Sequence, residues 1–354
     1  MHWFGPYCHR IDPVLGSVGG LYVWWYGLSF SLGFLNAHLY IRRKRRHLGL
    51  SLGAVYTLSL FLAVGVLLGG RFVEVVFYEW PFYRAHPGLI PAVWLGGMAT
   101  HGLLFGGLLG VWLFCRRQRL SFLRVTDVLA VPAAFILAMG RIGNFIDGQI
   151  VGRVTDAWWA VQFPDAEGFR HPVVLYDGLK NLLLIPILVR AAQARLRPGA
   201  VTGLFLFLYA SLRVLIDFFR EYPTTLLGLA TGQSLNLLMA LLGLVLLALR
   251  WRAEPAPGEP EARSQLDAPG KIAKPERLVW RPLLFALLII AAPVIPSDWT
   301  QDIPARYGKR HAGLRHSALY PAMDTAPANE NYPWQKKPTG TPGGETDVQT
   351  GETP

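Results

Sequence analysis

Residues 140 to 153 combine the side chains and the backbone freedom that a phosphate-binding site needs. The stretch reads GRIGNFIDGQIVGR and holds four glycines together with Arg141 and Arg153. Glycine lets backbone N–H groups approach a ligand closely, and arginine presents a planar fork that suits phosphate oxygens. Because an apolar run that could cross a bilayer directly precedes the stretch, we expect it to receive a phospholipid headgroup. A turn between two helices with solvated arginines would explain the composition equally well.

A second polar group lies inside an apolar run, at Arg213, Asp217 and Arg220. This spacing puts the three side chains on one face of a helix, with Tyr209 one turn earlier. A charged side chain at mid-depth in a membrane costs about 2.5–3.5 kcal/mol, so such residues usually face a cavity or a partner. We therefore expect this face to line a polar site. The alternative is a structural Arg213–Asp217 ion pair, with Arg220 reaching to the interface.

Two further residues could take part in chemistry at the same membrane face. His101 lies in GGMATHG, and the ordinary histidine pKa of about 6.5 suits a proton acceptor near neutral pH. A lone histidine beside small residues is more often a helix-packing residue, so both interpretations stay open. Tyr26 lies in WWYG, where an aromatic belt at the membrane interface would also explain it.

The composition is that of a multi-pass membrane protein. The chain has 354 residues, of which 52% are hydrophobic and only 16% charged, which is too apolar for a soluble domain of this length. The net charge of +11 does not indicate nucleic acid binding, because the basic residues lie at the ends of apolar runs. Cys8 and Cys115 are expected on opposite faces, so neither a disulfide nor a metal site is predicted.

The apolar runs predict an all-α integral membrane protein with seven transmembrane helices and an eighth C-terminal span. The basic segment 42–46 follows the first run and predicts, by the positive-inside rule, an N-terminus outside the cytoplasm. The run at 283–295 is short, so an interfacial helix is the alternative to a span. The seven expected spans are 20–40, 52–72, 95–115, 123–139, 172–189, 201–219 and 231–249.

The same runs divide the chain into four parts. We expect a membrane domain over 1–252 and a polar cytoplasmic linker over 253–279, where Pro, Glu and Lys accumulate. An extra transmembrane or interfacial helix follows at 280–297. The segment 298–354, rich in Pro, Thr, Gly and His, is expected to be a poorly ordered tail.

With these positions assigned, the chain resembles the bacterial prolipoprotein diacylglyceryl transferases over about residues 15–250. The stretch 140–153, called the signature segment below, is similar to the long signature of that family. Four shorter pieces follow the family's order: Trp25-Tyr26-Gly27, the GGMATHG piece at 96–102, His171-Pro172 with Leu175-Tyr176, and Tyr209 to Arg220.

The resemblance implies an enzyme of the bacterial inner membrane that needs no cofactor and no metal. It would transfer the diacylglyceryl group of phosphatidylglycerol to the lipobox cysteine of a preprolipoprotein and release glycerol phosphate. Arg141 and Arg213 would bind the phosphate and take part in catalysis together with Tyr26 and His101, of which His101 is our candidate acceptor of the thiol proton. The resemblance adds Asn144, Gly152 and Arg220 to the phosphatidylglycerol-binding residues.

Several positions depart from the family's usual residues. Asp147 stands in place of Asn, and Gln149 in place of Glu, which changes the charges beside the arginines; the other departures are Leu103 for Gly, Val174 for Gln, and Asp177 and Asp217 for Glu. A divergent paralogue that uses another phospholipid or acceptor is therefore one alternative. A non-catalytic membrane protein that binds lipid or lipoprotein is another.

Overall fold

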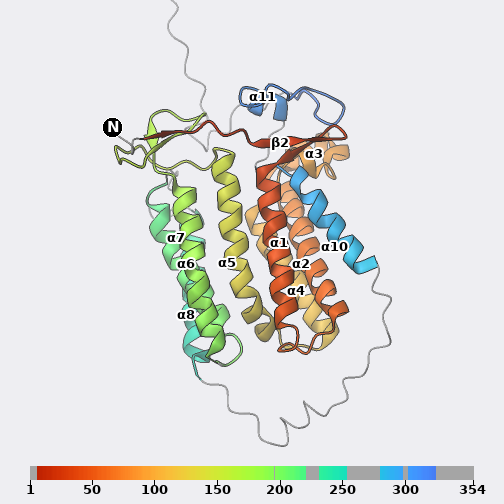
Figure 1. Cartoon of the computed structure of the whole chain (residues 1–354), viewed down its shortest axis with the longest axis vertical. Helices are drawn as coiled ribbons and strands as arrows, with labels where there is room; N and C mark the ends of the chain where they lie inside the picture. Colours follow the sequence, from red (N-terminus) through yellow and green to blue (C-terminus); the bar gives the residue numbers. More distant parts are fainter. Residues whose placement is uncertain (1–5, 195, 221–230, 253–279, 298–301, 324–354) are drawn as a thin grey trace, which may run out of the picture.

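The computed structural model describes residues 6–194, 196–220, 231–252, 280–297 and 302–323, and most of these form long helices. Figure 1 shows the helices side by side in one bundle. The long helices are α1 (Trp25–Lys44), α2 (Leu52–Val73), α4 (Thr100–Gln118), α5 (Phe122–Ile146), α6 (Val173–Gln193), α7 (Ala200–Asp217), α8 (Thr231–Arg250) and α10 (Trp280–Ala291). The short helical elements are η1 (Glu74–Tyr78), α3 (Trp80–Ala85), η2 (Pro87–Leu89), η3 (Val93–Leu95), η4 (Ala292–Val294) and α11 (Ile303–Tyr307).

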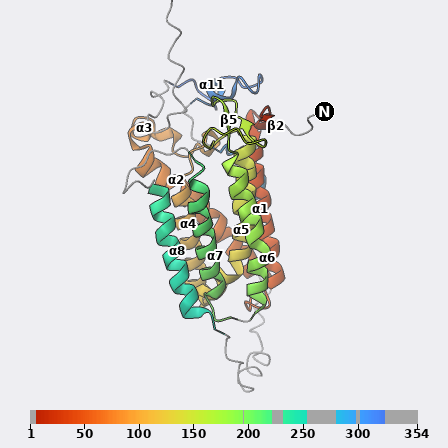
Figure 2. The ribbon, with the colours of Figure 1, turned by 90° about the vertical axis from the view of Figure 1, so that its left-hand side faces the viewer.

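Short strands gather at one end of the bundle, together with α11 (Figures 1 and 2). We call this the strand end. One sheet has the order β1-β4-β5, in which β1 is parallel to β4 and β4 antiparallel to β5, and β2 and β3 form a separate antiparallel pair. The strands are β1 (Tyr7–Cys8), β2 (Val14–Val18), β3 (Leu21–Trp24), β4 (Val161–Gln162) and β5 (Phe169–Arg170). These strands were not expected from the sequence.

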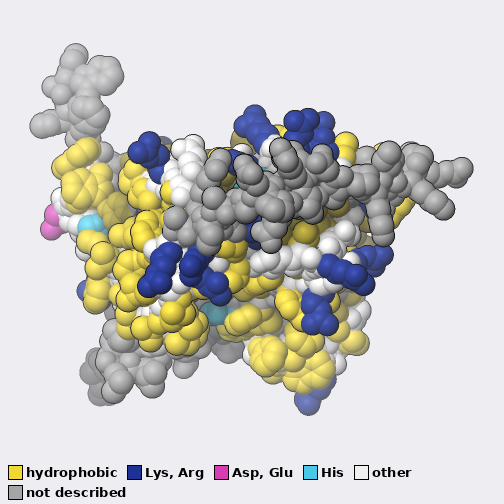
Figure 3. Space-filling model, turned by 90° about the horizontal axis from the view of Figure 1, so that it is seen from below, with side chains coloured by type: hydrophobic (Ala, Val, Ile, Leu, Met, Phe, Trp, Pro, Cys, Tyr) yellow, Lys and Arg dark blue, Asp and Glu magenta, His cyan; other side chains and the backbone are white. Residues whose placement is uncertain are grey.

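The opposite end of the bundle is strongly basic, and we call it the basic end. Figure 3 looks onto this end, where Lys and Arg side chains stand among hydrophobic ones. Arg42, Arg43 and Lys44 lie in the last turn of α1, and Arg116 and Arg117 in the last turn of α4. The predicted accumulation of basic residues on alternate connections is therefore seen at one end of the structure.

Within the part of the chain that the structure describes, four helical segments are long and apolar enough to cross a membrane: Leu52–Tyr78, Phe122–Ile146, Ala200–Asp217 and Gln233–Arg250. The helices α1, α4 and α6 are of similar length but contain more polar residues or glycine. The short helix α10 has 12 residues, which rise about 18 Å, less than the ~30 Å of a hydrocarbon core.

Several boundaries differ from those expected. The first long helix begins at Trp25 instead of residue 20, because Leu21–Trp24 pairs with β2. The helix α5 continues to Ile146 instead of ending at 139, so the first half of the signature segment is helical. Residues 302–323, expected within a poorly ordered tail, form α11 and packed turns at the strand end.

Glycine contacts hold α2 against α4. A Cβ on Gly106 would lie 2.0 Å from the carbonyl oxygen of Gly65, and one on Gly102 would lie 2.2 Å from that of Gly69. These distances are far below van der Waals contact, so neither position has room for any other residue. Close backbone approach of this kind is typical of helix pairs in membranes. The pair presents the first turn of α4, with His101, at the strand end.

At the basic end, a carboxylate from α5 fixes the beginning of α7. Asp127 accepts hydrogen bonds from the backbone N–H groups of Gly199 and Thr202, both at 2.7 Å, and from the Thr202 hydroxyl at 2.6 Å. These N–H groups have no acceptor within their own helix. The contact sets α7 against α5, and so it helps to bring Arg213 towards Arg141 at the other end.

Candidate active site

The signature segment begins as the last two turns of α5. Arg141 and Asn144 lie three residues apart, on one face, and Arg141 Nη1 donates to Asn144 Oδ1 at 3.2 Å. The opposite face packs on α1, because a Cβ on Gly143 would lie 2.8 Å from Ser29 Oγ and 2.9 Å from Tyr26 Cα. Glycine at 143 thus lets α1 approach the helix that carries Arg141.

A buried carboxylate on α6 joins the two arginines that the sequence singled out. Asp177 has no exposed surface. Its Oδ2 accepts from Arg141 Nε at 2.6 Å and also from Arg213 Nη1. Its Oδ1 lies 2.7 Å from Lys180 Nζ. A buried charge is tolerated where opposite charges and hydrogen bonds surround it, so Asp177 is the point at which α5, α6 and α7 converge.

A second carboxylate extends this group along α7. Asp217 Oδ1 lies 3.1 Å from Arg213 Nη2 and 3.7 Å from Arg220 Nη1. Asn236 Nδ2, from α8, lies 3.5 Å from Asp217 Oδ2. The structural Arg213–Asp217 ion pair considered from the sequence is therefore present, but Arg213 also contacts Asp177. We call the six charged residues the arginine cluster: Arg141, Asp177, Lys180, Arg213, Asp217 and Arg220.

The charges of the arginine cluster do not cancel. Among the described residues it contains four basic side chains and two carboxylates, which gives a formal charge of +2. The side chains of Arg141, Arg213 and Arg220 are 18%, 10% and 11% exposed. Positive charge with so little water around it is suited to an anion, and a phosphate could accept from guanidinium groups on two helices.

Gly152 and Arg220 lie side by side in the backbone. They form an isolated antiparallel bridge, and Arg153 Nε donates to the carbonyl oxygen of Arg220 at 3.1 Å. A Cβ on Gly152 would lie 2.6 Å from the carbonyl oxygen of His171, so this position requires glycine. Through these contacts the second half of the signature segment holds the end of α7, where Arg220 enters the cluster.

The other two predicted residues lie around this centre and not within its ion pairs. Tyr26 packs on Gly143 of α5, with its ring 4.9 Å from that of Phe30. His101 is exposed at the first turn of α4, and its Nδ1 lies 3.3 Å from the Tyr78 hydroxyl. The helix α4 packs chiefly on α2 (Figure 1), so His101 belongs to the other half of the bundle, at the same end.

Lys180 was not predicted from the sequence as a member of the site, and Asp177 was noted only as a departure from the residue that the family resemblance implies. Lys180 Nζ lies 3.8 Å from the centre of the Tyr209 ring, a cation–π contact that adds to its ion pair with Asp177. The signal was present in the sequence, because an Asp and a Lys three residues apart inside an apolar run are costly in a membrane unless they have partners.

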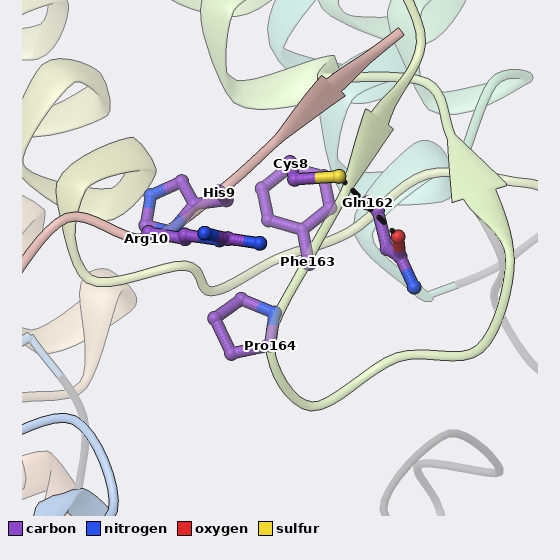
Figure 4. Close-up of a pocket in the computed structure, with 6 residues that line it drawn as sticks. All are labelled: Cys8, His9, Arg10, Gln162, Phe163 and Pro164. Atoms are coloured by element: carbon purple, nitrogen blue, oxygen red, sulfur yellow. Dashed lines mark hydrogen bonds between the residues drawn. The ribbon is translucent and has the colours of Figure 1, made fainter.

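A pocket of about 200 Å³ lies at the strand end, where the paired strands β1 and β4 end. Figure 4 shows its lining residues Cys8, His9, Arg10, Gln162, Phe163 and Pro164. The His9 ring stacks on Phe163, with centroids 5.8 Å apart, and its Nε2 donates to the carbonyl oxygen of Phe145 at 2.7 Å. The exposed Cys8 and the buried Cys115 are both free thiols.

His9 predicts a pH dependence of stability. Its Nδ1 has no hydrogen-bond partner among the described residues, and burial lowers the pKa of His9 below the usual 6.5, although the bond to Phe145 offsets part of the effect. Above pH 6.5 His9 is neutral in both states, and the folded chain keeps its full stability. As the pH falls below about 6.5 the unfolded chain binds the proton first, so the free energy of unfolding decreases.

The check is thermal unfolding of wild type and His9→Gln between pH 7.5 and 5.5. Gln can still donate to Phe145 but does not titrate, so its melting temperature should fall less over this range. Equal losses in the two proteins would contradict this origin of the pH dependence.

Comparison with known proteins finds one family over most of the chain. A family model described as prolipoprotein diacylglyceryl transferase matches residues 13–249. A phosphatidylglycerol–prolipoprotein diacylglyceryl transferase of Geobacter sulfurreducens is 40% identical over 257 residues, which cover 70% of this chain and 98% of that protein. Proteins of the same name from Chromohalobacter salexigens and Nitrosomonas europaea are 41% and 40% identical, over 67% and 71% of this chain and 91% and 93% of their own lengths.

The matched region contains every member of the arginine cluster, the signature segment, Tyr26 and His101. The chain continues about a hundred residues beyond it, so it is longer than these relatives. On a match of this extent and identity, the chain belongs to the prolipoprotein diacylglyceryl transferase family.

Proposed function

We propose that this membrane protein transfers the diacylglyceryl group of phosphatidylglycerol to the lipobox cysteine thiol of preprolipoproteins, at the arginine cluster. The observation that carries the proposal is the meeting of Arg141 and Arg213, from two helices, on the buried carboxylate of Asp177. Family membership supplies the substrates, since the relatives are named for phosphatidylglycerol and prolipoprotein.

The proposed reaction is a substitution at the glyceryl carbon that bears the phosphate. The cysteine sulfur forms a bond to this carbon while the carbon–oxygen bond to the phosphate breaks, and the electron pair leaves with glycerol phosphate. The phosphate gains negative charge as the bond breaks, because a diester becomes a monoester. A cluster of formal charge +2 with little exposed surface would stabilise this charge more strongly than that of the substrate, which lowers the barrier.

The remaining site residues have proposed roles that follow from their contacts. Asn144 would orient the Arg141 guanidinium through their hydrogen bond, and Gly152 would hold the chain that carries Arg220. We propose His101 as the acceptor of the thiol proton, because it is exposed at the strand end. Tyr26 packs against the helix that carries Arg141, and it would shape the wall of the site between His101 and the arginine cluster.

A transfer assay with the purified full chain tests this function. Vesicles contain phosphatidylglycerol labelled in its acyl chains, and the acceptor is a lipobox peptide, with a Cys→Ser peptide as control. The label should move to the cysteine peptide alone, and glycerol phosphate should be released. Transfer from phosphatidylethanolamine but not from phosphatidylglycerol would indicate a paralogue with another donor, and binding of phosphatidylglycerol without transfer would indicate a lipid-binding protein.

We also propose that seven helices cross the membrane and that the strand end faces outward; α10, too short to span the hydrocarbon core by itself, lies beside α1 and α2. The support is the accumulation of Arg and Lys at the basic end (Figure 3), since such residues stay on the cytoplasmic side. A reporter that is active only outside the cytoplasm should be silent when fused after Arg46 and active when fused within 154–168. The reverse pattern would overturn this orientation.

A further inference from the structure

Described residues that lie beyond the family match pack on α1 and α2 and at the strand end. We call the described residues 280–297 and 302–323 the C-terminal extension. The helix α10 packs along α1 and α2 (Figure 1), and Ser31 Oγ of α1 donates to the carbonyl oxygen of Ile289 at 2.8 Å. A Cβ on Gly27 would lie 2.4 Å from the carbonyl oxygen of Ala292. The extension is thus closely fitted to α1, and residues 302–323 lie over the strands.

At the strand end the extension completes a hydrophobic cluster. Half of the eight buried residues of this cluster belong to the extension, and the others come from the N-terminal strands and from the loop before α4. The Tyr307 ring lies 5.1 Å from that of Trp24 and has no exposed surface. The members are Val14, Trp24, Ala92, Leu95, Ile303, Tyr307, Leu314 and Tyr320.

Two side chains of the extension reach from this cluster to the signature segment. Gln149 Nε2 donates to the Tyr307 hydroxyl at 2.5 Å, and both residues are buried. Arg310 Nη1 donates to the backbone carbonyl of Asp147 at 2.7 Å. The extension therefore contacts the signature segment on both sides of Gly148.

The backbone directly after these two contacts is strained at Ile150. Gly148 has φ +66°, and Ile150 has φ +59°, a left-handed conformation that is a genuine outlier for a β-branched residue. Such a conformation persists only where its surroundings enforce it. Asp147 to Ile150, called the signature turn below, is also tied to the end of α5, because Gln149 N–H donates to the carbonyl oxygen of Asn144 at 3.1 Å.

We propose that Tyr307 and Arg310 are positioning residues, which hold the signature turn and through it keep Asn144 and Arg141 aligned for the phospholipid phosphate. The chain of contacts runs from Tyr307 to Gln149, from Gln149 to Asn144, and from Asn144 to Arg141. The effect of these residues on catalysis rests on the proposed function. Its structural part, the support of the signature turn by the extension, can be measured separately.

Tyr307→Phe and Tyr320→Phe form a matched pair for the test. Both tyrosines are fully buried in the same cluster, and both hydroxyls accept a hydrogen bond. The Tyr307 hydroxyl accepts from Gln149, whereas that of Tyr320 accepts from the backbone N–H of Tyr22 at 3.0 Å. Each variant removes one hydroxyl and keeps the ring, so a purely structural role predicts equal effects.

In the transfer assay with the full chain, we expect Tyr307→Phe to raise the KM for phosphatidylglycerol about fivefold, the size of one buried hydrogen bond. The KM for the peptide should stay unchanged, and Tyr320→Phe should match wild type in both constants. Arg310→Ala should also raise the lipid KM, and Arg310→Lys, which can still donate to Asp147, should restore part of the loss. Equal lipid KM values for the two tyrosine variants would overturn the proposal.

Hydrogen–deuterium exchange separates this inference from the function itself. The amides of residues 147–151 should exchange faster in Tyr307→Phe than in wild type or Tyr320→Phe. If these amides exchange faster in Tyr307→Phe but the wild-type chain transfers no lipid, the proposed function is contradicted, whereas the support of the signature turn by the extension is confirmed. Unchanged exchange at 147–151 in Tyr307→Phe would overturn the support whatever the activity.

Discussion

Asp177→Asn is expected to lower transfer from phosphatidylglycerol at least about a hundredfold, or about 2.7 kcal/mol of transition-state stabilisation. Asp177 is fully buried and contacts Arg141, Lys180 and Arg213. The amide removes the carboxylate that holds the two arginines at one point, and the formal charge of the cluster rises from +2 to +3. The guanidinium groups should then repel one another and lose their alignment. The measurement is kcat/KM for phosphatidylglycerol with the purified full chain.

The same variant should also destabilise the fold, because breaking a buried ion pair costs about 3–5 kcal/mol. Asp177→Glu is the control, since it keeps the charge and adds one methylene, and we expect it to retain most of the stability and part of the activity. Thermal unfolding of both variants beside wild type separates lost folding from lost alignment. If Asp177→Asn were as active as wild type, Asp177 would not be the residue that joins the arginines.

The sequence placed Arg141 and Arg213 near the same membrane face, and the resemblance implied that both bind one phosphate. The charges of Asp177 and Lys180 indicated that these residues have partners, but not that Asp177 lies between the two arginines. The pattern of basic ends and apolar runs predicted that both arginines would lie near the same membrane face. It gave no depth or rotation for the helix that carries Asp177, which sits one turn after His171-Pro172 and looks like an ordinary helix start. Which of several intramembrane charges meet is decided by helix packing.

The predicted helix boundaries were wrong for a related reason. The end of α5 was expected at 139, because Gly140 and Gly143 resemble the beginning of a turn. In the structure these glycines are places where Phe30 and Tyr26 of α1 come close, so they serve packing within a helix that runs to Ile146. A single sequence does not distinguish a glycine that breaks a helix from one that lets two helices touch.

The folded part of the C-terminal segment was missed because its order comes from tertiary contacts. Residues 302–323 contain only one short helix, and their composition is that of a linker. Tyr307 and Tyr320 are nevertheless fully buried against residues of the first hundred. Arg310 contacts the backbone carbonyl of Asp147, and Tyr307 contacts the side chain of Gln149, so the extension reaches the two signature positions at which the resemblance implied departures from the family.

Arg141→Ala is expected to reduce kcat/KM for phosphatidylglycerol by about 10²- to 10³-fold, the effect of removing one preorganised donor to developing negative charge. The Arg141 side chain is 18% exposed, compared with 10% for Arg213, so it can be removed with less damage to the fold. Arg213→Ala should be as inactive but less stable, because both Asp177 and Asp217 lose a cation. Arg141→Lys keeps the positive charge but loses the planar guanidinium, so its kcat/KM should lie between those of wild type and Arg141→Ala.

Arg190→Ala is the matched control for these variants, since Arg190 is an exposed arginine in the last turn of α6, at the basic end. It should leave transfer at the wild-type level. Complementation of a strain depleted of its own transferase gives the same order in cells, with rescue by wild type and Arg190→Ala and none by Arg141→Ala or Arg213→Ala. Full activity of a stable, membrane-inserted Arg141→Ala protein would show that the arginine cluster does not bind the phosphate, and the proposed mechanism would be wrong.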